Sequence, residues 1–447
     1  MKKLLSCVLV LTMVLGLGAM SVAAAEEKTV YPAGTVTIYA TGQPQFQQMY
    51  FDNWLERNRD IAPEVTIEFV QVETQAAGRQ KIAMDHLAGA YDDMPDATYV
   101  DSVSVVDLSS AGLLLDMTDF YAENEALFVE GAANDATIQG KVWGVPENIR
   151  PQVLFYNNDL FEKYDVDPAM MATMEGYLEA GRLLKEKSDG EVFLSYIDPT
   201  TYTWRYWGRR GLMPQANARI WDDAGNVIVG EDEGTKLALG FLAQLHDEEL
   251  LYKTTMMSPP LYEATDEGKI ATFYIGAFWD EFLRSNLSAT AGQWRVMNAP
   301  VFEEVGTAGA PVSSFMCLVD NGTNEYAGLV QKMWLDFHTD NEARKTWVNE
   351  MVEIGGAYSN PITLEMLADP FWQETAEFYG DTSFRKAEGE GLNNPSKNMV
   401  VTIKDAEADT IISNEIEKYV AGEQTMEEAI ANMDRELNAQ IGTTEIP

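Results

Sequence analysis

Gly140-Lys-Val-Trp-Gly-Val-Pro146, followed directly by Glu147-Asn-Ile-Arg-Pro-Gln-Val-Leu-Phe-Tyr-Asn-Asn-Asp-Leu-Phe161, is the stretch around which the chain is organised. Pro146 has a fixed φ and no N–H, and it biases Val145 away from the helical region, so this part is predicted to be extended. Residues 153–156 form a short apolar run that ends at two asparagines, which is typical of a buried strand followed by a turn. We therefore expect one lobe to end near Pro146 and another to begin.

The first residues have the pattern of a secretory signal peptide. A short basic start is followed by an apolar run over residues 8–20 and by small residues up to Ala25. The run is too short and wrongly flanked for a transmembrane anchor, so residues 1–25 are predicted to be cleaved off. Cys7 imitates a lipoprotein attachment site with too few apolar residues before it. It is predicted to be discarded with the signal peptide, and the alternative is a lipid anchor.

The composition is strongly acidic, with 71 acidic against 31 basic residues and a formal net charge of −40. Such a charge repels nucleic acid and anionic lipid and keeps a protein dispersed, so we expect a monomer with no nucleic-acid partner. The length suggests two or three domains. After cleavage only Cys317 remains, so no intrachain disulfide is expected and large buried cores must hold the fold.

The mature chain opens with a β-α-β pattern. Residues 36–39 and 65–70 read as strands, and residues 46–57 between them carry apolar side chains at helical spacing. This order predicts a parallel sheet covered by helices.

A helix over 75–90 and a strand over 96–101 continue the pattern. In open α/β sheets, ligands bind beyond the carboxyl ends of the strands. On that rule Gln43, Gln45 and Asp101 are expected to face one crevice, the alternative being a solvated or helix-capping role.

The second half of the chain contains the densest cluster of aromatic and basic residues, Tyr202-Thr-Trp-Arg-Tyr-Trp-Gly-Arg-Arg210. Residues 268–279 read as a strand that enters a Gly turn and an aromatic step, and residues 311–319 as a second return strand. Residues 221–229 are predicted to be a hairpin. Its carboxylates resemble a calcium loop only loosely, because the Gly and the distal Glu are not in place, so no metal is predicted there.

Several short sequence motifs occur in a characteristic order along the chain: Gly112-Leu-Leu-Leu-Asp, the Trp-Gly-Val-Pro crossover, Gly276-Ala-Phe-Trp279, Gly355-Gly-Ala-Tyr-Ser-Asn-Pro361 and Tyr419-Val-Ala-Gly-Glu-Gln-Thr-Met-Glu-Glu-Ala429. In this order, across nearly the whole mature chain, they resemble family 1 extracellular solute-binding proteins. These are the sugar-type receptors of ABC importers.

The resemblance implies an α/β, two-lobed periplasmic-binding-protein-like (type II) fold with hinge strands and a ligand cleft between the lobes. It places residues 30–147 and 313–366 in the N-terminal lobe, and residues 148–312 and 367–447 in the C-terminal lobe. It further implies a secreted protein, periplasmic or at the cell surface, that closes on a carbohydrate by hinge motion and delivers it to a membrane permease.

A sugar site needs aromatic platforms together with side chains that donate and accept hydrogen bonds at short range. By the resemblance, Trp279 matches the stacking tryptophan after the family's Gly turn. Tyr202 and Trp204 match an aromatic pair, with Trp207 nearby, and Tyr358 lies beside two glycines of the returning lobe. The alternative for each aromatic residue is a place in the core.

Arg150 departs from the family pattern, because it aligns near a position where maltose-binding relatives carry a carboxylate. With Arg209 and Arg210 it is a candidate for recognising a uronate or another anion, since guanidinium pairs bidentately with carboxylate. The alternative is a structural ion pair. Ser313 and Ser314 replace the paired glycines often found at that place, which weakens the case for a backbone contact with the ligand there.

An enzyme is the rival function, in particular a glycosidase or lyase, because these need only two suitably spaced carboxylates. No such pair stands out, the three histidines are scattered, and neither a Gly-rich phosphate loop nor a Gly-x-Ser-x-Gly elbow is present. The sequence therefore predicts a binding protein without cofactor or metal. A peptide, a polyamine or another small solute is the alternative to a sugar ligand.

Overall fold

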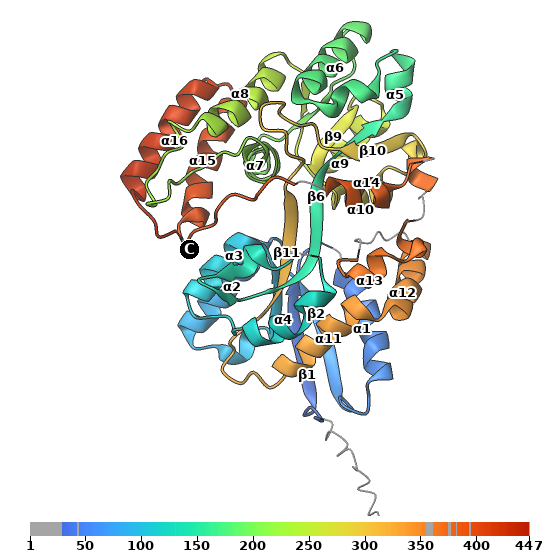
Figure 1. The fold of residues 1–447 in the computed structure, drawn as a ribbon, viewed down its shortest axis with the longest axis vertical. Helices are drawn as coiled ribbons and strands as arrows, with labels where there is room; N and C mark the ends of the chain where they lie inside the picture. The colour runs from blue at the N-terminus through green and yellow to red at the C-terminus, as the bar shows by residue number, and fades with distance from the viewer. Residues whose placement is uncertain are drawn as a thin grey trace, which may run out of the picture.

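The computed structural model describes residues 29–42, 44–129, 131–354, 361–373, 377–380, 382–392 and 395–446. The expected signal peptide with Cys7, and the candidate ligand contacts Gln43 and Tyr358, lie outside these residues. Figure 1 shows two lobes joined by the long strands β6 (Val145–Asn157) and β11 (Pro311–Leu318). The two-lobed α/β fold expected from the sequence is confirmed.

The N-terminal lobe is built on three parallel strands. β1 (Gly34–Ala40) lies between β2 (Val65–Gln71) and β3 (Ala97–Val100), and the first connection is α1 (Pro44–Arg57), as the β-α-β pattern predicted. The remaining helices of this lobe are α2 (Gln75–Ala88), α3 (Ser102–Ser110), α4 (Thr118–Asn124), α11 (Ala327–Thr339), α12 (Asn341–Glu353) and α13 (Leu364–Leu367), beside the short strands β4 (Thr137–Ile138) and β5 (Lys141–Val142).

β6 belongs to both lobes because it changes partners along its length. Its first half pairs with β11, and its second half pairs with β9 (Thr272–Gly276) and β10 (Trp294–Asn298), all antiparallel. The strand order is β10-β6-β11-β3-β1-β2, with β9 on β6, so one sheet runs through both lobes. The strand tolerates its two prolines because Pro146 adjoins a register shift and Pro151 forms the last pair with β11.

The C-terminal lobe surrounds the second half of β6. Its helices are α5 (Asn158–Lys163), α6 (Met174–Lys187), the π-helix η5 (Thr203–Leu212), α7 (Met213–Gln215), α8 (Glu233–Asp247), α9 (Pro259–Asp266), α10 (Trp279–Asn286), α14 (Phe384–Gly391), α15 (Asp405–Val420) and α16 (Met426–Gln440), and β7 (Ser195–Ile197) pairs with β8 (Leu251–Lys253). The expected hairpin over 221–229 is reduced to one bridge, between Trp221 and Val227, because Asp222 closes its turn through backbone hydrogen bonds.

Each lobe has its own core. Trp54, Trp334 and Trp372 belong to the N-terminal cluster, whereas Tyr379 and Phe384 pack with the sheet of the C-terminal lobe. The chain therefore crosses between the lobes a third time after Trp372, beyond the border at 366 that the resemblance implied. Among the described residues, no helix is both long and apolar enough to cross a membrane.

Candidate functional site

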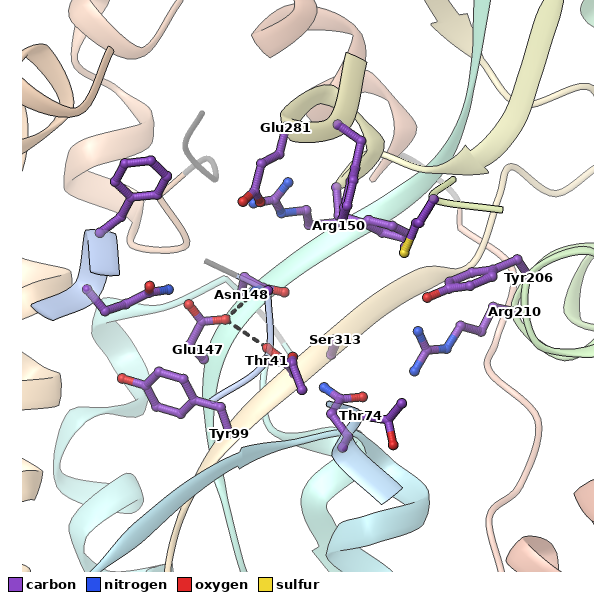
Figure 2. Close-up of a pocket in the computed structure, with 18 of the residues that line it drawn as sticks. Thr41, Thr74, Tyr99, Glu147, Asn148, Arg150, Tyr206, Arg210, Glu281 and Ser313 are labelled. Atoms are coloured by element: carbon purple, nitrogen blue, oxygen red, sulfur yellow. Dashed lines mark hydrogen bonds between the residues drawn. The ribbon is translucent and has the colours of Figure 1, made fainter. Parts of the chain in front are cut away.

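A cleft of about 1440 Å³, which includes the solvent at its mouth, lies between the lobes (Figure 2). The two hinge strands line it with Glu147, Asn148, Arg150, Ser313 and Ser314. The N-terminal lobe adds Thr41, Gly42, Phe46, Gln47, Glu73, Thr74, Gln75, Tyr99, Phe337, Arg344, Trp347 and Met351, and the C-terminal lobe adds Tyr202, Arg205, Tyr206, Arg210, Met257, Phe278, Glu281 and Phe282.

A row of aromatic rings forms the wall on the C-terminal lobe. The ring centroids are 5.8 Å apart for Tyr202 and Tyr206, 5.5 Å for Tyr206 and Phe278, and 6.3 Å for Phe278 and Phe282. Such rings offer broad, rigid apolar area, and tyrosine adds a hydroxyl at its edge. The row can therefore hold a flat apolar face, such as the C–H face of a sugar ring.

Helical spacing explains which aromatic residues reach the cleft. Tyr202, which caps η5, and Tyr206 and Arg210 within it are four residues apart and line the cleft, while Trp207 on the same helix is fully buried. Phe278 and Phe282 are likewise four apart and line the cleft, whereas Trp279 turns into the core. A π-helix at this place fits the tendency of π segments to occur at functional sites.

A β-bulge positions Glu147. Ser314 pairs with Asn148 and Phe315 pairs with Pro146, which leaves Glu147 as the extra residue of β6. Its carboxylate accepts hydrogen bonds from the Ser314 hydroxyl at 2.7 Å and from the Asn148 amide (Figure 2). Burial raises the pKa of Glu147, although these two donors oppose the effect.

Charged groups occupy both sides of the cleft. Figure 2 shows Arg150 and Glu281 pointing toward one another on one side, with Tyr206 and Arg210 on the other. Burial raises the pKa of Glu281 to about 6, even though the charge of Arg150 lowers it. Arg150 itself is only 5% exposed. These groups can donate hydrogen bonds to a polar ligand and accept hydrogen bonds from it.

One ion-pair cluster joins the lobes. The Asp101 carboxylate lies 3.4 Å from the Arg205 guanidinium and 3.1 Å from that of Arg210, and its other oxygen caps α3 by accepting from the Ser104 N–H at 3.0 Å. Arg205 also donates to Gln75 at 3.0 Å. Burial raises the pKa of Asp101, but the two guanidiniums outweigh it and lower the pKa to about 2.

The cleft continues past this cluster into a second cavity between α2 and α3 on one side and η5 and α15 on the other. Arg205, Arg210 and Ser313 line both cavities, whereas Asp101 and Trp204 line only the second. The Trp204 indole donates to Asp409 at 2.8 Å. The two cavities therefore form one long site with the interlobe ion pairs at its middle.

The structure places the predicted ligand contacts in three groups. Arg150, Tyr202 and Ser313 line the cleft, and Asp101 and Trp204 line the second cavity. Gln45 is exposed on α1 outside both cavities, and Trp207 and Trp279 lie fully buried in the C-terminal lobe. Arg209 lines the second cavity but is held by Asp405 and Asp409.

Several lining residues were not predicted from the sequence, chiefly Glu147, Tyr206, Phe278, Glu281, Phe282 and Arg344. The i,i+4 pairs Tyr202/Tyr206 and Phe278/Phe282 were a usable signal, because side chains four residues apart on a helix share one face, whereas the residue directly after Tyr206 or Phe278, a tryptophan in both cases, points elsewhere. No signal in the sequence pointed to Arg344, because α12 reaches the cleft only after β11 has led the chain back into the N-terminal lobe. Within the described ranges, no group of three His, Cys, Asp or Glu side chains is placed to hold a metal ion.

The sequence profile of the bacterial extracellular solute-binding proteins matches residues 39–345, which is more than half of the chain. The chain belongs to this family. It is 24% identical to the arabinooligosaccharide-binding protein of Halalkalibacterium halodurans over 60% of this chain and 58% of that protein. It is also 24% identical to the lactose-binding protein of Rhizobium radiobacter, over 65% and 67%. The first of these matches thus spans little more than half of the relative's length.

Solved structures share the fold over nearly the whole chain. The ABC transporter associated binding protein of B. animalis subsp. lactis, in complex with β-1,6-galactobiose, superposes with a TM-score of 0.75 at 18% identity and covers 91% of this chain and 97% of that one. At this identity the likeness supports the two-lobed fold alone.

Proposed function

We propose that this protein is the extracytoplasmic receptor of a carbohydrate importer. It captures an oligosaccharide between its lobes, closes on it by hinge motion about β6 and β11, and delivers it to a membrane permease. The observation that carries the proposal is the aromatic row Tyr202, Tyr206, Phe278 and Phe282, which faces carboxylate, amide and guanidinium groups across an interlobe cleft. Stacking surface combined with short polar side chains is the chemistry that sugars require.

The relatives support a sugar over another solute. The curated proteins that match are named for binding arabinooligosaccharide and lactose, and the similar solved structure holds a galactobiose. The arginines of the cleft disfavour a polyamine, because like charges repel. The family consists of solute-binding proteins, which supports our proposal that the protein acts by binding and release without catalysis.

A calorimetric titration tests the proposal directly. The purified protein is titrated with arabino-, galacto-, malto- and uronate oligosaccharides, with dipeptides and with spermidine. We expect one sugar class to bind with micromolar affinity or better and to raise the melting temperature by mass action. Binding of peptides or spermidine with no response to any sugar contradicts a carbohydrate receptor. Release of smaller sugars during incubation contradicts a binding protein.

A further inference from the structure

Arg344 on α12 lines the interlobe cleft although it is only 2% exposed. Arginine is almost never fully buried unless it is paired. A buried cation without a close carboxylate is costly, because its lost hydration is not repaid. The contacts of the Arg344 side chain therefore show whether the protein balances its charge or leaves it available to a ligand.

The guanidinium is held in a fixed aromatic setting. It lies 3.7 Å from the ring centroid of Phe337 and 5.4 Å from that of Trp347, and its Nη1 donates to the Phe337 carbonyl at 3.0 Å. That carbonyl belongs to the last turn of α11, where a cation is favourable. These contacts orient the group but do not balance its charge.

No carboxylate among the described residues lies within ion-pair distance of Arg344, and its Nε has no hydrogen-bond partner. The charge of Glu147 stabilises the Arg344 cation from nearby, but burial raises the pKa of the Glu147 carboxyl and so disfavours its charged form. Burial lowers the pKa of Arg344 to about 10. The geometry leaves a rigid, desolvated guanidinium beside an open cleft.

The cleft also differs in charge from the rest of the molecule. The chain has a formal net charge of −40, yet the described cleft lining contains four arginines against three glutamates. The arginines are Arg150, Arg205, Arg210 and Arg344. Arg205 and Arg210 are ion-paired with Asp101, whereas Arg344 has no such partner in the described part of the chain and is suited to an anionic ligand, since guanidinium matches carboxylate in a two-donor geometry.

We infer that the oligosaccharide bound in this cleft carries a carboxylate, as a uronate does, and that Arg344 pairs with it. This inference rests on the proposed function and narrows its substrate class. The aromatic row holds the sugar rings, while the guanidinium in its aromatic setting selects the acidic group.

Matched ligands test the pairing. Oligomers of galacturonate, glucuronate and mannuronate are titrated calorimetrically, each beside its methyl ester, which keeps the sugar and removes the charge. We expect the acid to bind about 30-fold more tightly than the ester or better, as is usual for a desolvated charge pair. Arg344→Gln removes this preference, and Arg344→Lys, which keeps the charge but not the fork, retains only part of it. Arg435→Gln, an exposed arginine on α16, keeps it in full.

Thermal melts and binding of the neutral ester report the folding of each variant, and Arg344→Lys serves if Arg344→Gln does not fold. Equal binding of acid and ester, or a preference that survives in Arg344→Gln, overturns the inference and leaves the receptor function intact. Binding of sulfated or phosphorylated sugars with rejection of uronates overturns the carboxylate assignment. Failure to bind any sugar contradicts the proposed function itself.

Discussion

Trp279 and Phe282 lie on the same short helix, but only Phe282 faces the ligand cleft. Their rings stack with centroids 5.0 Å apart, so the buried indole supports the ring that lines the cleft. Trp279 is fully buried among Phe273, Tyr262 and Phe282. Removal of a buried side chain that supports a binding residue is expected to lower the free energy of unfolding more than it lowers the affinity for the ligand.

We therefore expect Trp279→Ala to lower the free energy of unfolding by about 3–5 kcal/mol, the usual loss for a large buried aromatic residue. Phe282→Ala should cost less stability, because its ring is partly exposed, and should weaken sugar binding through the lost stacking of about 1 kcal/mol. Urea unfolding and calorimetry measure the two effects. A fully stable Trp279→Ala variant that has lost binding would instead place the indole at the ligand.

Glu281 gives the site a pH dependence. Its pKa in the folded protein is about 6, above the ordinary 4.5, mainly because of burial. The folded state then keeps a proton that the unfolded state has lost, so the free energy of unfolding falls as the pH rises from about 4.5 to 6. Glu281→Gln should lose this part of the pH dependence and be about 2 kcal/mol more stable than the wild type above pH 6.

Chemical unfolding between pH 4 and 8 measures the free energy of unfolding of the wild type and of Glu281→Gln. The titration of other groups cancels in the difference between these two values. Glu233→Gln is the control, because this exposed glutamate on α8 forms only a surface ion pair. If the difference in the free energy of unfolding does not change with pH, Glu281 does not have a raised pKa in the folded protein.

At the scale of elements, η5 decides the C-terminal wall of the cleft. One face presents Tyr206 and Arg210 to the ligand, and the other is tied to α15. Arg209 on η5 pairs with Asp405 and Asp409 of α15, and Asp405, which is fully buried, also accepts from the Trp221 indole at 3.0 Å. Two carboxylates of α15 thus hold the π-helix, and Asp405 is the fully buried one.

Asp405→Ala leaves the Arg209 guanidinium, the Trp221 N–H and the Thr402 hydroxyl without their shared acceptor. We expect it to lower the free energy of unfolding by about 3–5 kcal/mol, as for other broken buried pairs, and to weaken ligand binding through displaced η5 side chains. Asp223→Ala, which removes the fully exposed partner of Arg219, should change stability by less than about 1 kcal/mol. Similar losses in both variants would contradict a special role for Asp405.

At the scale of the molecule, local patterns predicted more than contacts between distant segments. The β-α-β opening and the extended crossover at Pro146 followed from hydrophobic spacing and proline geometry, and the two lobes followed from the resemblance. The bulge at Glu147 depends on the register against β11, and the place of Arg344 depends on the returning chain. Neither position follows from local spacing along the chain, so Glu147 and Arg344 were not predictable from the sequence, whereas Arg150, Ser313 and Asp101 were predicted and line the two cavities.

The pairs from Asp101 to Arg205 and Arg210 are the clearest contacts between the lobes, because Asp101 begins α3 in one lobe and both arginines lie on η5 in the other. Asp101→Asn removes the charge but keeps a good helix N-cap, so α3 itself should be unaffected. We expect the lobes to separate, with a larger radius of gyration in X-ray scattering, and sugar affinity to fall about tenfold, the equivalent of about 1.4 kcal/mol. Asp107→Asn, whose partner Arg79 lies in the same lobe, should leave the radius of gyration unchanged. If both variants scatter like the wild type, the packing of α15 on α3, and not these ion pairs, holds the lobes together.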